Sequence, residues 1–293
     1  MSAGPEDATP AAGAPGPGTR PGPAPSPADP SQVAPAPAPG GRGLPSPFAA
    51  VVGYTLRSCL PARRRLILVA ICLGGVALGL LTPLIDAESG VSTAEAFGVV
   101  AEQGLFGLIL PLTCLVVGDA VMGADIRAGT FPLTWLSPVP LRTIAVGRWL
   151  GGWLVALLTV VPALTVAVLV AGVPDAGAAA ATMALAAATG SAAYIGLFIM
   201  IGVVVRRSAV WSLALVFLGE RLLGASLSGI AQLSPLWEAQ QVYAGLGPGG
   251  AELVRDGTPQ GWGAVARLAL ILVVTLAVAG RRLRRLTPTG GDE

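Results

Sequence analysis

Histidine and lysine are both absent from this chain of 293 residues, and only 12% of its residues are charged. Without histidine the chain can hold neither a histidine-based catalytic triad nor a histidine metal site. Its three cysteines include no C-x-x-C pair, which disfavours a zinc ribbon and a disulfide framework. We therefore expect no metal and no cofactor. Soluble domains are typically about 25% charged, so a soluble enzyme and a nucleic-acid-binding protein are disfavoured too.

Apolar residues dominate what is present. They make up 53% of the chain, and the mean hydropathy is +0.73. Six runs approach the ~20 apolar residues that a membrane-spanning helix needs, and they do not alternate as barrel strands would. The sequence therefore predicts an all-α polytopic protein with six transmembrane helices, at residues 66–85, 98–118, 149–170, 179–205, 209–230 and 262–280.

The segments before and after these runs differ in composition. Fourteen of the 26 prolines fall within residues 1–47, mixed with Ala, Gly and Ser. Such a segment buries too little apolar surface to fold, so we predict that residues 1–45 form a disordered cytoplasmic tail. Residues 46–286 are predicted to form one membrane domain, and residues 287–293 a short cytoplasmic tail. The apolar spacing of Phe48–Leu60 predicts an amphipathic helix along the inner membrane surface before the first span.

The charged residues predict the orientation of the chain in the membrane. All 18 basic residues are Arg, which together with 40 Gly and 26 Pro is typical of a high-GC bacterial genome. With both termini inside, nearly all the arginines that flank spans face the cytoplasm, whereas the outer loops are mostly acidic. We therefore expect a multi-pass protein of the bacterial plasma membrane with both termini cytoplasmic. One outer loop contains Ser92–Glu95, a capping-box pattern that predicts a helix start.

The predicted inner loop, residues 119–148, contains a series of short motifs. They are Asp125, Gly129-Thr130, Pro138-Val139, Arg142 and Gly147-Arg148. In this order they resemble the membrane subunit of ATP-binding-cassette exporters of the second exporter class, which are bacterial permeases with six spans. Phe217–Glu220 and Leu233–Pro235 extend the resemblance, which covers about residues 46–286.

The resemblance implies a function and a set of partners. In such exporters a short helix of this loop sits in a cleft of the ATPase subunit and transmits ATP-driven closure to the spans. The implied coupling residues here are Asp125, Arg127, Gly129, Thr130, Pro138 and Arg142. Because a P-loop needs a lysine, ATP hydrolysis is expected on a partner chain and this subunit is not itself an enzyme. The implied assembly has two ATPase subunits and a second permease copy, as a homodimer or a related heterodimer. Its expected cargo is an amphiphile such as a drug, an antibiotic or a lipid-like molecule, which is moved outward.

An ionisable pair, Glu220 and Arg221, lies well inside the fifth predicted span. Charge within a membrane is costly and marks a candidate translocation pathway, or else residues that pair with other spans. Glu220 also supports an alternative function, an ion-coupled secondary transporter. An integral-membrane enzyme is a third alternative, and the absence of histidine argues against it. Near the outer surface, Arg267 is expected to extend its side chain to the membrane boundary.

Overall fold

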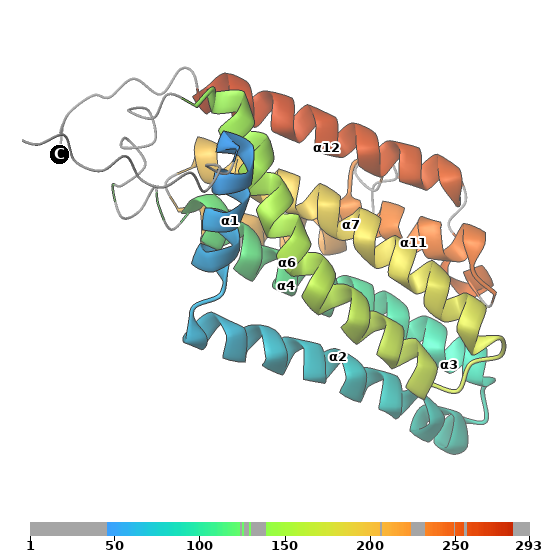
Figure 1. The fold of residues 1–293 in the computed structure, drawn as a ribbon. Coiled ribbons are helices and arrows are strands. Elements are labelled where there is room, and N and C mark those ends of the chain that lie inside the picture. Colours follow the sequence, from blue (N-terminus) through green and yellow to red (C-terminus); the bar gives the residue numbers. More distant parts are fainter. Residues whose placement is uncertain are drawn as a thin grey trace, which may run out of the picture. The chain divides into compact units, whose positions relative to one another are not determined.

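The computed structural model describes residues 46–123, 125, 129, 139–205, 207–223, 232–248, 250–254 and 257–283, with the side chains of 89, 221–223 and 251–252 excepted. All of them lie in the compact unit Pro45–Glu293. These residues form helices and no strands, which confirms the predicted all-α class (Figure 1). The two predicted tails and residues 224–230 of the fifth predicted span lie outside the described residues.

Among the described residues, five stretches of helix are long and apolar enough to cross a membrane. Each overlaps one predicted span. They are α2 (Ala62–Ser89), the continuous stretch Thr93–Gly123, α6 (Leu141–Val170), α7 (Ala176–Val204) and α12 (Trp262–Leu283). The second stretch consists of α3 (Thr93–Val99), π-helical η2 (Val100–Ile109), α4 (Leu110–Gly118) and π-helical η3 (Asp119–Gly123).

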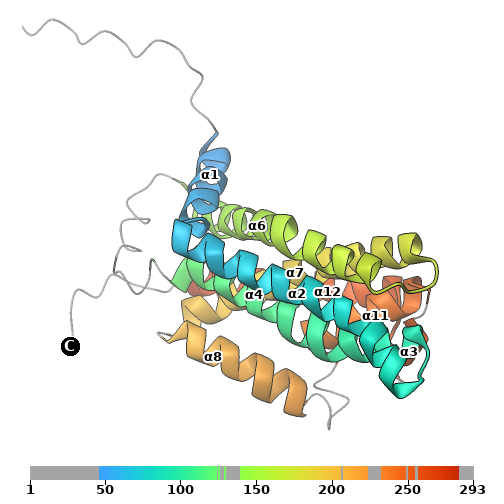
Figure 2. The same cartoon turned by 90° about the horizontal axis from the view of Figure 1, so that it is seen from below.

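The fifth predicted span has a shorter counterpart. It is described as α8 (Ser208–Ala214) followed by the π-helical segment η5 (Leu215–Leu223). In Figure 2, α8 lies at the edge of the bundle, and it contacts α7 and α4. The described structure therefore supports five spans, and the sixth stays a prediction.

Several helices extend beyond the apolar runs that predicted them. Both α2 and α6 begin within arginine-containing sequence, four and eight residues before the predicted span starts at 66 and 149. Charged residues of the terminal turns still form helical hydrogen bonds, so an apolar run marks the buried length of a helix and not its ends. At the start of α3, Ser92 Oγ accepts from the Glu95 amide at 3.3 Å, and Glu95 Oε2 accepts from the Ser92 amide at 3.0 Å. The predicted capping box is thus confirmed.

The core of the domain is built around α7, which lies between α6 and α12 (Figure 1). Small residues on α7 let its neighbours approach closely. The indole N–H groups of Trp149 and Trp153, stacked on each other, donate to the carbonyls of Ala192 and Ala188, both at 3.0 Å. On the α12 side, a Cβ at Gly196 would lie 2.8 Å from Leu272 Cδ1. These small residues serve packing within the chain.

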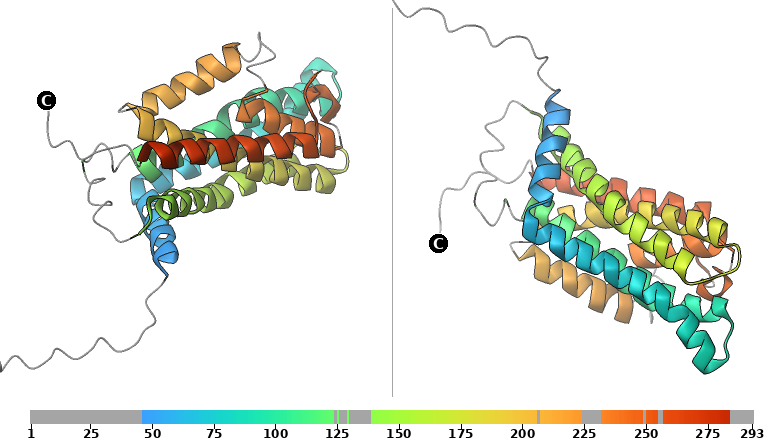
Figure 3. Two further views of the ribbon diagram at one scale, coloured as in Figure 1. Left: turned by 90° about the horizontal axis from the view of Figure 1, so that it is seen from above. Right: turned by 60° about the horizontal axis from the view of Figure 1, so that its bottom comes forward.

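The predicted amphipathic helix is present as α1 (Pro47–Cys59). It crosses the end of the bundle where α6 begins, at a steep angle to α2 and α6 (Figure 3). Thr55 and Cys59 are buried against the bundle, while Tyr54 and Leu60 remain exposed.

A further helix, α11 (Pro235–Leu246), packs between α7, α12 and η2. Eight of its 12 residues are buried. Beyond it, the short 3₁₀ segment η6 (Gly250–Leu253) belongs to a loop whose two sides are joined by Gln241. The Gln241 side chain donates to the Leu253 carbonyl at 2.8 Å, and the Gln241 carbonyl accepts from the Gly261 amide at 2.9 Å.

Candidate functional site

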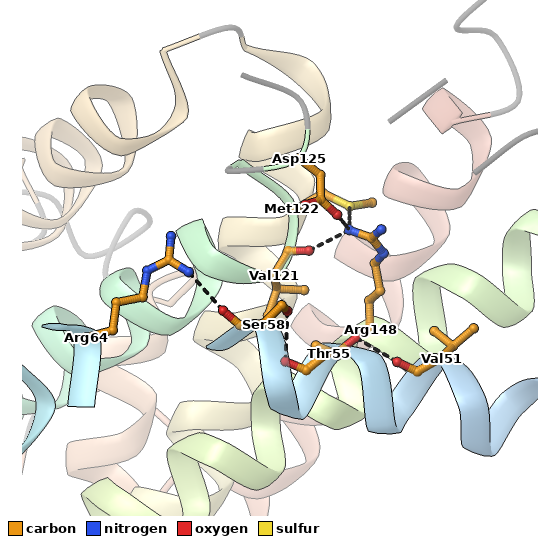
Figure 4. A network of polar contacts seen from close by, with 8 residues as sticks. All are labelled: Val51, Thr55, Ser58, Arg64, Val121, Met122, Asp125 and Arg148. Carbon is orange, nitrogen blue, oxygen red and sulfur yellow. Dashed lines mark hydrogen bonds and ion pairs between the residues drawn. The ribbon is translucent and has the colours of Figure 1, made fainter. Parts of the chain in front are cut away.

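The arginine-rich end of the bundle contains a buried polar network (Figure 4). At its centre is Arg148, in the third turn of α6, which is only 5% exposed. Its Nη1 lies 2.6 Å from Oδ2 of Asp125, two residues after η3, and donates to the Val121 carbonyl of η3 at 2.7 Å. The guanidinium also lies over the Tyr54 ring of α1, 5.7 Å from the ring centroid.

Arg148 therefore joins α6 to three other parts of the chain, namely the loop at Asp125, η3 and α1. A planar guanidinium with five N–H donors suits this role, because it can satisfy a carboxylate, a carbonyl and a ring face together. Burying a charge is costly unless it is paired and hydrogen-bonded. The pairing of Asp125 with Arg148 meets that condition and fastens the loop to α6.

Close packing of α1 on α6 depends on two glycines one turn apart. A Cβ at Gly147 would lie 2.9 Å from Val51 Cγ1, and a Cβ at Gly151 would lie 2.7 Å from Thr55 Cβ. Real Cβ atoms do not approach this closely, so only glycine allows α1 to sit at this distance. This G-x-x-x-G spacing lets the backbones of the two helices come together.

The C-terminal end of α1 is held by polar contacts as well (Figure 4). Ser58 Oγ donates to the Thr55 carbonyl at 2.9 Å, and Arg64 of α2 donates to the Ser58 carbonyl at 3.0 Å. A cation at a helix C-terminus satisfies free carbonyls and complements the helix dipole. In the last turn, burial raises the pKa of the Cys59 thiol to about 11, so this cysteine is not a reactive nucleophile at neutral pH.

The structure describes three of the six predicted coupling residues. Asp125 belongs to the network, and Gly129 has a φ of 67°, in the left-handed region that favours glycine. Arg142 lies in the first turn of α6 and lines a separate cavity with α12. The other predicted residues, Arg127, Thr130 and Pro138, lie outside the described residues.

Sequence reasoning did not place Arg148 or α1 among the site residues. Gly147-Arg148 was part of the motif series, but only as the start of the third span. The sequence feature that could have indicated the α1–α6 contact is the spacing of Gly147 and Gly151. This spacing predicts a close contact between two helices but does not specify which helix is the partner.

Glu220 lies in a second buried network, where η5, α7 and α11 meet. It is 3% exposed. The Tyr194 hydroxyl donates to its Oε2 at 2.5 Å, and the Ser234 hydroxyl donates to its Oε1 at 2.8 Å. The Trp237 indole N–H donates to the Glu220 backbone carbonyl at 3.0 Å. Both carboxylate oxygens thus have protein partners. The side chain of Arg221 lies outside the described residues.

A partly buried ion pair joins α11 to α12. Arg267 Nη1 lies 3.2 Å from Glu238 Oε1, and the Glu238 side chain is 1% exposed. Arg267 therefore has a carboxylate partner within the chain and keeps 33% of its side chain exposed, and its extension to the membrane boundary stays a prediction. Glu238 precedes Arg267 by 29 residues, and α11 places it beside α12, where a buried carboxylate needs a cation.

Within the described ranges, no group of three or more Cys, Asp or Glu side chains could hold a metal ion. Comparisons with protein-family models and with curated proteins found no match.

Proposed function

We propose that this chain is the membrane subunit of an ATP-binding-cassette exporter of the bacterial plasma membrane. Both termini are cytoplasmic in this proposal, and separate ATPase subunits, two per assembly, drive an amphiphilic substrate outward. A second permease copy completes the assembly. The observation that carries the proposal is the Asp125–Arg148 ion pair, which links the loop bearing the exporter-like motifs to two helices.

The network suggests how a force on the loop reaches the membrane helices. A displacement of the loop at Asp125 acts on Arg148, which is part of the long helix α6. Since α1 packs against Gly147 and Gly151, it has to move with the same end of α6. A partner that pushes on the loop would therefore move α1 and α6 as one body, as rigid packed elements do.

The alternative, an ion-coupled transporter that uses Glu220, gains no support from the geometry. An ion-binding carboxylate needs access to water or to the ion at some stage of transport. Both oxygens of Glu220 instead accept hydrogen bonds from neighbouring helices, and the residue is 3% exposed. This arrangement suits a residue that fixes α11 to α7 and η5.

The coupling role can be tested with Asp125→Asn and Arg148→Gln, each in the full chain co-expressed with a P-loop ATPase from the same organism. The wild-type chain is expected to co-purify with the ATPase and to alter its hydrolysis rate. Each variant should lose most of that stimulation, because removal of one partner leaves the other charge buried and uncompensated, at a cost of about 3–5 kcal/mol.

Arg57→Gln is the matched control, since it removes a cation from the exposed surface of α1 at the same end. Exposed charges contribute about 1 kcal/mol or less, so this control should keep its stimulation. A wild-type chain that recruits no ATPase would overturn the proposed function. Full stimulation in both pair variants would overturn the coupling role alone.

A further inference from the structure

A cavity of about 300 Å³ lies between the start of α6 and the end of α12. Arg142 and Arg281 line it, together with the apolar residues Val146, Leu276 and Ala277. In Figure 1 these two helix ends lie side by side at the end of the bundle near α1. The cavity is separate from the Asp125–Arg148 network, since it opens on the α12 side of α6.

The lining of the cavity carries charge of one sign. Of the described residues, two arginines line it and no aspartate or glutamate does. Within the described part of the chain, neither Arg142 nor Arg281 forms an ion pair. The cavity is therefore complementary to an anion, and guanidinium groups bind phosphate oxygens through paired N–H donors.

The apolar part of the lining indicates what the anion is attached to. It continues along α12 as an exposed stripe one and two turns away, where Leu270 is 62%, Val273 63% and Val274 50% exposed. Residues 270, 273, 274 and 277 share one face of a helix, because they are spaced by three and four. Since α12 is long and apolar enough to cross a membrane, this stripe is suited to contact acyl chains, which a free phosphate does not have. An anion on an acyl chain would cover both parts.

We propose that this cavity binds the headgroup phosphate of an anionic phospholipid from the leaflet at the arginine-rich end, with an acyl chain along α12. Basic pockets between transmembrane helices on the cytoplasmic side are suited to such headgroups. Gly280 lines the cavity, and a Cβ built there meets no atom within 4 Å, so a larger side chain at this position would project into open space. The proposal depends on membrane insertion and not on an ATPase partner.

The test uses the purified full chain in detergent, with phosphatidylglycerol or phosphatidylcholine added, and measures bound lipid by native mass spectrometry. The wild-type chain is expected to retain phosphatidylglycerol in preference to phosphatidylcholine. The double variant Arg142→Gln/Arg281→Gln should weaken phosphatidylglycerol binding about tenfold or more, since each arginine near an anionic lipid contributes severalfold. Gly280→Leu, which fills the cavity without changing charge, should weaken it similarly.

The matched control is Arg57→Gln/Arg282→Gln, which removes two exposed arginines at the same end, neither of which lines the cavity. It should bind phosphatidylglycerol within about twofold of wild type, and a melting curve without lipid reports whether each variant is folded. Equal losses in the control and in the cavity double variant would overturn the site in favour of general surface attraction. Unchanged binding in Gly280→Leu would overturn it as well. Stabilisation by inorganic phosphate alone, to the same extent as by lipid, would overturn the lipid as its occupant.

Discussion

Arg148 and Glu220 each bury an ionisable side chain between helices, and their polar atoms are satisfied by different kinds of partner. Arg148 is neutralised by a carboxylate 2.6 Å away, whereas Glu220 is stabilised by the hydroxyl groups of Tyr194 and Ser234. Removal of a partner of Arg148 or of Glu220 leaves an unsatisfied polar group in the core. Such a group typically costs about 1–3 kcal/mol, and more if it is charged. Arg148 thereby links α6 to α1 and to the loop at Asp125, and Glu220 links η5 to α7 and α11.

At this scale the expected effect of Glu220→Gln is a loss of stability. The amide keeps the shape of the side chain but replaces one acceptor oxygen by an NH₂ group, so one of the two hydroxyl donors must reorient. We expect a lower melting temperature in detergent, by a few degrees, with transport per assembled complex retained. The measurement is a melting curve for Glu220→Gln beside Tyr194→Phe, which removes one of the same hydrogen bonds.

Similar losses in Glu220→Gln and Tyr194→Phe would agree with a packing role. If Glu220→Gln melts like wild type while transport falls, the pathway role predicted from the sequence is correct instead.

Among the helices, α1 depends most directly on a single neighbour. Its packing distance is fixed by Gly147 and Gly151 of α6, so a side chain at either position must displace it. An isolated helix of 13 residues, the length of α1, has little stability of its own in water. We therefore regard the α1–α6 contact as the structural basis of the proposed coupling.

The substitution Gly151→Leu should separate α1 from α6 and uncover Cys59. In the native chain this thiol is 1% exposed and its pKa is about 11, so the reactive thiolate is scarce at pH 8. Exposure would return the pKa toward about 8.5 and increase the rate of maleimide labelling by roughly 100-fold.

Gly53→Leu is the control on α1 itself, since a Cβ there meets no atom within 4 Å. It should leave the labelling rate of Cys59 at the native level, as measured by mass spectrometry of the labelled peptide. A slow rate in Gly151→Leu would mean that α1 does not depend on this contact.

The helices differ in how far the sequence could predict them. Continuous apolar runs predict five of the helical stretches, because a helix buried in a membrane needs apolar residues on all sides. The helical spacing of apolar residues at 48–60 predicts α1, because only one face of that helix is buried. The Ser92 capping box was local enough to predict from four residues. By contrast, α11 lies in a stretch of mixed polarity, and its burial depends on Glu238 meeting Arg267 across 29 positions. The partners of Asp125 and Glu220 are likewise remote in sequence, and no local pattern specifies them.

For the whole molecule, the asymmetry of charge makes a definite prediction of orientation. Both termini and the loop 119–148 are expected inside, because arginine-rich segments are retained on the cytoplasmic side. In a cysteine-free background, Asp256→Cys should be labelled by a membrane-impermeant maleimide in sealed cells. Thr130→Cys should be labelled only after the cells are opened. Efficient labelling of Thr130→Cys in sealed cells would contradict this orientation.

The hydrogen bonds of Gln241 have a practical consequence for the loop between α11 and α12. Gln241 forms hydrogen bonds to both Leu253 and Gly261, which fixes the two ends of the segment that contains the exposed Gly257. Residues inserted at Gly257 should therefore change that segment without displacing α11 or α12. Closing a loop of twice the length costs only about 0.6 kcal/mol more. The tip at Gly257 is thus a natural place to insert an antibody epitope, which would give a handle for imaging this small protein while α11 and α12 keep their contacts.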